Sequence, residues 1–64
     1  CTSVTIYGNT SGDYQEATFI CCDGTSEFER VEDYASTTFC AQEGTVSTSG
    51  TGGMSTGGTC TSDC

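Results

Sequence analysis

Six cysteines in a chain of 64 residues constrain its fold more than any other feature of the sequence. An even number of cysteines at this density is typical of a disulfide framework in a small exported domain. Disulfides do not persist in a reducing cytosol, so the sequence predicts a protein that is secreted, displayed on an extracellular surface or part of a virion. The residues expected to form the disulfides are Cys1, Cys21, Cys22, Cys40, Cys60 and Cys64.

The sequence does not fix how these cysteines pair. Six cysteines allow fifteen pairings, and setting aside a strained bond between the adjacent Cys21 and Cys22 leaves twelve. Bonds within one chain and bonds between two chains are both compatible with the count. A cysteine at position 1 is also typical of bacterial lipoproteins, but a lipid on Cys1 would leave five other cysteines, an odd number. An intrachain disulfide is therefore the preferred interpretation of Cys1.

The small apolar content explains why the fold needs such bonds. The chain has twelve large apolar side chains and contains neither Leu nor Trp. Burying one of them contributes about 1.5–3 kcal/mol, whereas ordering each residue costs about 1.5 kcal/mol. A disulfide that closes a loop of ~15 residues adds about 3 kcal/mol in the chain-entropy model. We therefore expect a single disulfide-rich β domain over residues 1–64.

Alternation of β-branched or aromatic residues with polar residues predicts three strands. In the second of them, alternation places the adjacent Cys21 and Cys22 on opposite faces, with Phe19 on the side of Cys21. The three predicted strands cover Thr2–Tyr7, Tyr14–Cys22 and Ser36–Ala41.

The segment Ser26–Ala35 fits two kinds of secondary structure. Its first four residues match a helix capping box, and several apolar residues fall on one helical face. The dipeptide Asp23-Gly24 just before it is a strong hairpin signal, because both residues tolerate positive φ. A strand is the preferred interpretation, and a helix is the alternative.

Residues Gly44–Thr59 are rich in Gly, Ser and Thr, a composition typical of linkers. Because Cys40 and Cys60 bracket this segment, we expect a strand around Thr45–Ser49, a loose loop over Gly50–Gly58 and a short edge strand. The predicted fold class is all-β, a small disulfide-stapled antiparallel sheet or sandwich of about five to six short strands.

Charge excludes two classes of partner. Nine acidic residues against the single basic residue Arg30 give a formal net charge of −8. Nucleic-acid binding requires a basic patch, which this composition cannot supply, and anionic membrane surfaces repel such a chain. We expect no nucleic-acid partner and no direct membrane insertion.

The residue types that carry most catalysis are missing. Without His or Lys there is no histidine-based triad and no Schiff-base chemistry. A carboxylate pair for glycoside hydrolysis would lack a cleft in so short a chain, and the vicinal pair Cys21-Cys22 is not a Cys-x-x-Cys redox motif. We expect no catalytic residues, and hence not an enzyme.

Metal binding is not expected either. Structural zinc sites usually pair their ligands about two to four residues apart, and the chain has no Cys-x-x-Cys pair and no His. Asp13 with Glu16, or Glu32 with Asp33, offers carboxylates for calcium, but no EF-hand pattern is present. A solvated acidic face is the preferred interpretation, and no cofactor is predicted.

Three segments carry a resemblance to a known class of protein: Ala17–Thr25, Thr37–Val46 and Gly57–Cys60. The first contains a strand that ends in Cys-Asp-Gly, the second contains Cys-Ala-x-x-Gly-Thr-Val, and the third closes with Gly-Thr-Cys. In these motifs the chain resembles short cysteine-bearing β-modules of surface and fibre proteins from Bacteroidetes-type and other aquatic bacteria, and of structural proteins of their phages.

The resemblance covers roughly residues 4–60 and implies a strand over Glu27–Tyr34. It also implies that three cysteines occupy the usual positions of the module and that the other three are additional. The usual positions are Cys22, Cys40 and Cys60, and the additional cysteines are Cys1, Cys21 and Cys64.

Two classes of function are compatible with these observations. The first is a non-enzymatic structural subunit of an extracellular fibre, cell-surface filament or virion appendage, whose main partners are copies of itself. The alternative is a secreted disulfide-rich binding molecule, such as a signalling peptide, toxin or inhibitor. The nearly featureless composition of Gly50–Gly58 favours the structural class, because a ligand usually presents a charged or aromatic loop.

Two kinds of surface site are expected. Unpaired strand edges recruit other chains unless charge, Lys or Pro blocks them, and two predicted strands lack all three. The residues expected at these self-assembly edges are Val4, Ile6, Thr45 and Val46. Asn9-Thr10-Ser11 is an N-glycosylation sequon in a turn, so Asn9 is the predicted acceptor of a covalent glycan.

Overall fold

The computed structural model describes residues 1–61, which contain six β-strands and no helix. No segment among these residues is therefore a helix able to cross a membrane. The predicted all-β class and the number of strands are confirmed. The strands are β1 (Thr2–Tyr7), β2 (Tyr14–Ile20), β3 (Ser26–Glu32), β4 (Ser36–Ala41), β5 (Ser47–Gly50) and β6 (Gly53–Thr59).

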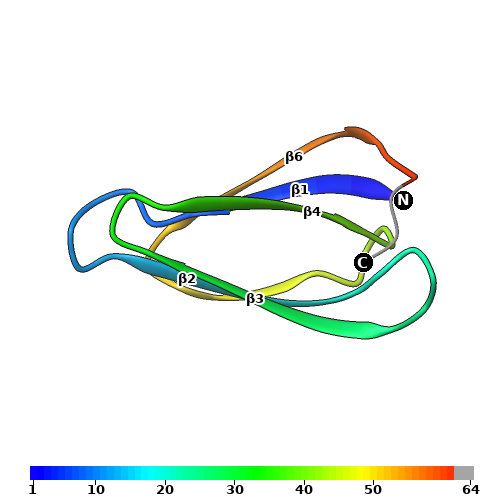
Figure 1. The fold of residues 1–64 in the computed structure, drawn as a ribbon, viewed down its shortest axis with the longest axis horizontal. Coiled ribbons are helices and arrows are strands. Elements are labelled where there is room, and N and C mark those ends of the chain that lie inside the picture. The colour runs from blue at the N-terminus through cyan, green and yellow to red at the C-terminus, as the bar shows by residue number, and fades with distance from the viewer. Residues whose placement is uncertain (62–64) are drawn as a thin grey trace.

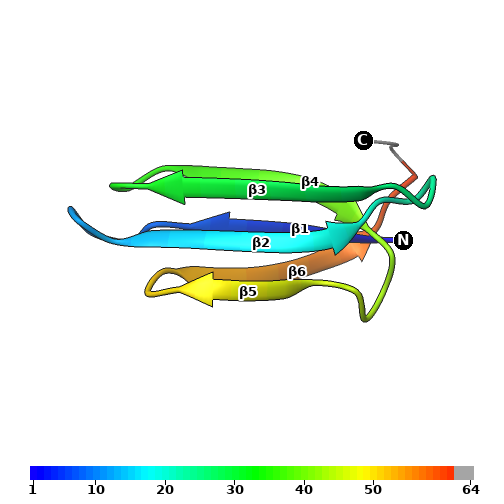
Figure 2. The same cartoon turned by 90° about the horizontal axis from the view of Figure 1, so that it is seen from below.

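The strands form two antiparallel sheets of three strands each, packed face to face as a sandwich (Figure 1). One sheet has the order β4-β1-β6 and the other the order β3-β2-β5. Figure 2 shows the stacking from below: β1 lies over β2, β4 over β3 and β6 over β5. Each sheet therefore has one central strand, β1 or β2, and two edge strands.

The core forms where the alternation of the two central strands points inward. In β2 every second residue is buried, from Gln15 through Ala17 to Phe19, while Thr18 between them is exposed. Cys21 continues the inward series with no exposed surface, as the sequence predicts. The rings of Phe19 and Phe39, one from each sheet, stack with centroids 3.9 Å apart and join the two layers.

Few side chains fill this core, and the strands contribute unequally. The buried apolar residues come from β1, β2, β3 and β4 and from Cys21 just after β2, and the partly buried Val46 packs against them. Strand β5 is exposed throughout, and Met54 of β6 is 45% exposed. The buried apolar cluster consists of Val4, Ile6, Ala17, Phe19, Cys21, Val31, Phe39 and Ala41.

The predicted hairpin after β2 is present. The amide of Gly24 donates to the carbonyl oxygen of Cys21 at 2.9 Å, and the amide of Cys21 donates to that of Thr25 at 2.8 Å. Gly24 has φ 95°, a conformation that costs glycine little because it has no Cβ. The hairpin joins β2 to β3 in continuous antiparallel register.

The segment that fits both helix and strand in the sequence is a strand as far as Glu32. It pairs along its full length with β2, and these long-range backbone bonds outweigh the local helical pattern. It ends at a turn in which Asp33 and Tyr34 have φ 48° and 68°. The amide of Ala35 donates to the carbonyl oxygen of Glu32 at 3.0 Å across this turn, which carries the chain from β3 in one sheet to β4 in the other.

The loose loop predicted over Gly50–Gly58 is wrong, because most of this segment is strand β6. The chain reverses between β5 and β6 against the start of β2. The carbonyl oxygen of Tyr14 accepts hydrogen bonds from the amides of Thr51 and Gly52, at 3.0 and 2.7 Å. The buried side chain of Gln15 donates from Nε2 to the carbonyl oxygen of Gly52 at 3.1 Å. These bonds replace side-chain packing in ordering a glycine-rich segment.

The β5–β6 turn gives the first prediction. A Cβ at Gly52 would overlap the carbonyl oxygen of Tyr7, whereas a Cβ at Gly58, in the same region of the chain, meets nothing within 4 Å. We expect Gly52→Ala to destabilise the domain by about 1–3 kcal/mol, as overpacking does, and Gly58→Ala to leave stability unchanged. Urea unfolding of the two variants measures the difference. Equal midpoints would show that the turn relaxes without cost.

Candidate functional site

Two of the disulfides are fully described, and they join Cys1 to Cys22 and Cys40 to Cys60. Cys21 is disulfide-bonded as well, so every described cysteine is in a disulfide, as predicted. The predicted disulfide residue Cys64 lies outside the described residues. For Cys1, the bond to Cys22 confirms the intrachain interpretation.

The two bonds hold different parts of the sandwich. Cys1 precedes β1 and Cys22 follows β2, so their bond ties the two central strands, and with them the two sheets. Cys40 lies in β4 and Cys60 follows β6, so their bond ties the two edge strands of one sheet. Each bond closes a loop of about 20 residues, which corresponds to roughly 3 kcal/mol.

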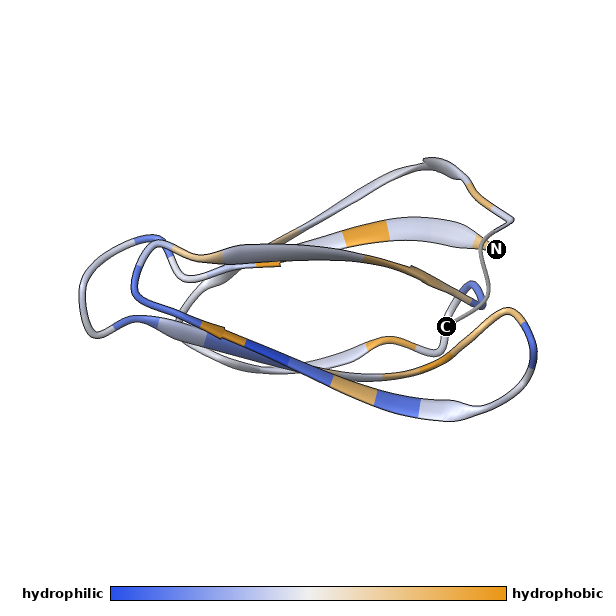
Figure 3. Ribbon diagram, viewed as in Figure 1, coloured by the Kyte–Doolittle hydropathy of each residue, from blue (hydrophilic) through white to orange (hydrophobic). Residues whose placement is uncertain are grey.

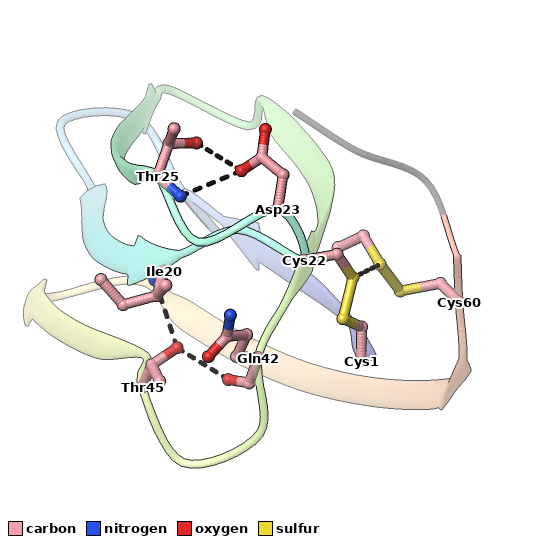
Figure 4. The surroundings of a disulfide bond; sticks show 9 residues. Cys1, Ile20, Cys22, Asp23, Thr25, Gln42, Thr45 and Cys60 are labelled. Carbon is pink, nitrogen blue, oxygen red and sulfur yellow. Dashed lines mark hydrogen bonds between the residues drawn. A yellow bond between two sulfur atoms is a disulfide. The ribbon is translucent and has the colours of Figure 1, made fainter.

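The sulfur atoms of these two disulfides gather at one end of the molecule (Figure 4). The Sγ atoms of Cys22 and Cys40, which belong to different disulfides, are 3.3 Å apart. The Sγ atoms of Cys1, Cys22 and Cys40 all lie within 4.8 Å of one another, and that of Cys60 is bonded to Cys40. We call these four side chains the sulfur cluster.

The structure corrects one of the two predicted self-assembly edges. Val4 and Ile6 lie in β1, the central strand of its sheet, where both backbone edges are paired with β4 and β6. Their side chains are buried in the core, at 2% and 0% exposure. Sequence alternation identifies a strand but carries no information about its place in the sheet.

The second predicted edge lies in the expected region but begins later in the chain. Strand β5 is an edge strand of its sheet, but it starts at Ser47, so Thr45 and Val46 precede it. Thr45 instead caps the loop: its Oγ1 donates to the carbonyl oxygen of Gln42 at 2.7 Å and accepts from the amide of Ile20 at 3.2 Å. Val46 packs against the core.

Charge is divided between the two sheets. Strands β1, β4 and β6 contain no charged residue, and we call their sheet the neutral sheet. The other sheet, the acidic sheet, carries Glu16 on β2, and Glu27, Glu29, Arg30 and Glu32 on β3. Figure 3 shows this division, with the hydrophilic stretches concentrated along β3 and the connecting turns. The remaining described carboxylates lie in turns and loops.

The edge strands therefore differ in whether their charges oppose pairing with a strand of another chain. Strand β3 carries charges that oppose pairing with another strand, whereas β4, β5 and β6 carry none. Every residue of β6 after Gly53 is exposed. Hydroxyl groups dominate the neutral sheet, where Thr5 and Thr38 form a cross-strand hydrogen bond of 2.8 Å between their Oγ1 atoms. This sheet ends on both sides in uncharged strands.

The basic residue Arg30 forms ion pairs within the acidic sheet. Its guanidinium lies 3.1 Å from Glu16 and 2.6 Å from Glu32, and 4.8 Å from the ring centroid of Tyr14. The hydrogen bond to Glu32, followed by that to Glu16, raises the pKa of Arg30. Two of the carboxylates considered for calcium are thus engaged in ion pairs.

The other two carboxylates considered for calcium organise the turns at the opposite end from the sulfur cluster. Asp13 accepts hydrogen bonds from the amide of Asn9, at 3.1 Å, and from the hydroxyl of Thr51. Asp33 accepts from the amide of Gly12 at 2.6 Å. Asn9, the predicted glycan acceptor, is exposed in this turn region.

A hollow opens on the β6 side of the neutral sheet. It has a volume of about 320 Å³ and lies between β6 and the loop that connects β4 to β5. Its lining includes Val4, Ala41, Val46 and Met54.

The carboxylate of Asp23 is fixed by the hairpin that follows β2. Its Oδ1 accepts from the hydroxyl of Thr25 at 2.6 Å and from the amide of Thr25 at 2.9 Å. These bonds, that of the hydroxyl first, lower the pKa of Asp23 below its ordinary value of 3.8, because they stabilise the charged form.

No known protein family matches the chain, and comparisons with curated proteins and with solved structures also found no match.

The position of the disulfides gives the second prediction. Together the two described bonds are worth about 6 kcal/mol, comparable to the whole stability of a small domain. We expect reduction in metal-free buffer containing a chelator to unfold the chain. Far-ultraviolet circular dichroism before and after reduction measures this, with the untreated protein at the same temperature as the control. A reduced chain that keeps its β signal would contradict the prediction.

The hairpin carboxylate gives the third prediction. Because the folded-state pKa of Asp23 is lowered, its charged form stabilises the fold above pH 3.8, and this is lost as the pH falls through the lowered pKa. Thr25→Val removes the hydroxyl bond and is expected to raise the pKa of Asp23 toward 3.8. An NMR titration measures the change, with Thr48→Val on exposed β5 as the control. The same pKa in both variants would contradict the assigned cause.

Proposed function

We propose that this domain is a non-enzymatic structural subunit that assembles with copies of itself into an extracellular fibre, cell-surface filament or virion appendage. The observation that carries the proposal is the neutral sheet, whose two edge strands, β4 and β6, are both uncharged. Such edges present unpaired backbone groups, which a strand from a second copy satisfies.

The division of charge favours one way of joining. Two copies with a net charge of −8 repel each other unless they meet where carboxylates are absent. Pairing β4 with β4 would bring two charged β3 strands together, since β3 lies beneath β4. Pairing β6 of one copy with β4 of the next brings charged β3 beside uncharged β5.

Joining β6 to β4 also leaves a free β6 and a free β4 at the two ends of the pair. A contact between two different surfaces propagates when its rotation does not close a ring, so the neutral sheet continues from copy to copy as a filament. The hollow beside Met54 lies along the same β6 side and offers a partly apolar surface to the neighbour, with Glu43 in its lining.

The disulfides support the placement of this subunit outside the cytosol. Bonds that tie the sheets and their edges persist only in an oxidising environment, which a secreted protein or a virion surface provides. The exposed Asn9 adds a site for a glycan at the turn end of the molecule, where its side chain lies beside Gly53 at the start of β6.

Assembly through β6 gives the fourth prediction. A lysine on an edge strand blocks pairing, so we expect Ser55→Lys, on exposed β6, to raise the concentration needed for assembly roughly tenfold or more, equivalent to about 1.4 kcal/mol. Light scattering and electron microscopy of concentrated protein measure it. Added salt is expected to promote assembly of the unmodified chain, because it screens repulsion between acidic sheets.

The matched control is Thr18→Lys, which makes the same charge change at an exposed position of the central strand β2. This variant is expected to assemble like the unmodified chain. Loss of assembly in both variants would assign the effect to charge and not to the β6 edge. A chain that stays monomeric at high concentration would contradict the structural proposal and favour the alternative, a secreted binding molecule such as a signalling peptide, toxin or inhibitor.

A further inference from the structure

We propose that the sulfur cluster is a metal site in the reduced protein, where the thiolates of Cys1, Cys22, Cys40 and Cys60 bind one Zn²⁺ or a similar thiophilic divalent cation. In the oxidised protein the four sulfur atoms are bonded in pairs. Binding therefore follows reduction by a thiol or phosphine, in which each disulfide takes up two electrons and two protons and yields two thiols. Binding of the metal then releases the thiol protons to solvent.

The distances in the sulfur cluster suit a tetrahedral site. Zinc–sulfur bonds of about 2.3 Å place neighbouring ligands about 3.8 Å apart. The Sγ atoms of Cys22 and Cys40 are already 3.3 Å apart without being bonded, and that of Cys1 lies within 4.8 Å of both. Cys60 joins the group through its bond to Cys40, and Figure 4 shows its side chain beside those of Cys1 and Cys22. Three sulfur atoms are thus already close enough to share one metal ion, and Cys60 becomes the fourth ligand when its Sγ turns from Cys40 toward that ion.

In the folded chain, backbone hydrogen bonds bring the four cysteine-bearing segments to the same place as the disulfides do. The amide of Cys60 donates to the carbonyl oxygen of Cys1 at 3.1 Å. Cys40 pairs with Ser3 in the register of β1 and β4. The end of β2 is held against the end of β4 by a bond of 2.7 Å from the amide of Gln42 to the carbonyl oxygen of Ile20. A metal at this point would clamp the same strand ends as the disulfides do.

The chemistry of the donors selects the kind of metal. The group that converges here contains only cysteines, with no carboxylate among its ligand atoms. Thiolate ligands favour zinc and other soft or borderline cations over calcium and magnesium. The ligands come from separate strand ends, so the short ligand spacing by which zinc sites are identified in sequences is absent. The site therefore holds the fold together when the disulfides have not yet formed or have been reduced.

The test uses the full chain reduced with a phosphine without oxygen and titrated with Co²⁺, whose tetrahedral thiolate complexes absorb in the visible and near-ultraviolet. We expect one Co²⁺ per chain, the charge-transfer bands of thiolate ligands, a β-type circular dichroism spectrum in the metal-bound protein, and displacement of the cobalt by Zn²⁺. Failure to bind a single saturating equivalent would overturn the proposal.

The adjacent cysteines provide a matched pair of variants. Cys22→Ala removes a ligand and is expected to weaken binding by about tenfold or more, since even groups behind metal ligands contribute about 10- to 100-fold. Cys21→Ala, one residue away but buried in the core, is expected to bind like the unmodified chain. An unfolded chain cannot distinguish the two positions, so equal loss in both would show that binding does not use the folded cluster.

The cavity left by Cys21→Ala is a separate source of weakness, and Cys21→Val controls for it by keeping apolar volume in the core. Binding by Cys21→Val with the cobalt spectrum of the unmodified chain supports the site, and loss of the spectrum in this variant overturns it. Because the measurement concerns reduced protein alone, its result is independent of whether the oxidised protein forms fibres.

Discussion

Covalent bonds at one end of the sandwich compensate for a core that is too small to hold six strands. The buried apolar cluster has eight members, and β5 and β6 contribute none of them. What holds these two strands is backbone pairing, the buried amide of Gln15 against the turn at Gly52, and the bond from Cys40 to Cys60. The disulfide from Cys1 to Cys22 holds the two sheets together. The stack of Phe19 on Phe39 is the main aromatic contact between them. A chain without Leu or Trp can therefore form a layered fold.

Local features of this fold follow from the sequence because they depend on neighbouring residues. Alternation identifies β1, β2 and β4, and Asp23-Gly24 identifies the hairpin because a glycine with φ 95° completes it. Burial of Cys21 opposite to Cys22 follows from the same period of two. The strand β3 was predictable only with the help of its flanks, since its own residues also fit a helix.

Features that depend on distant residues do not follow from the sequence. Val4 and Ile6 alternate as an edge strand would, but β1 is central because β4 and β6 both pair with it. The glycines of β6 are typical of a linker, and Asp13, Tyr14 and Gln15, far away in the chain, order the turn that precedes it. The sulfur cluster is of the same kind: no spacing in the sequence brings Cys22 within 3.3 Å of Cys40, and the pairing of strands does.

Because the two sheets differ in charge, the domain has one negatively charged side and one uncharged side. Strands β2 and β3 carry negative charge on one side of the sandwich, and the strands of the other side, β1, β4 and β6, carry none. Such a body has a dipole moment across its thickness, so repulsion between copies depends on how they are turned as well as on how far apart they are. The ionic strength therefore influences how two copies are oriented when they meet. In dilute salt the acidic sheets repel each other, so the copies meet through their neutral sheets, whereas in concentrated salt this repulsion is screened and no orientation is favoured.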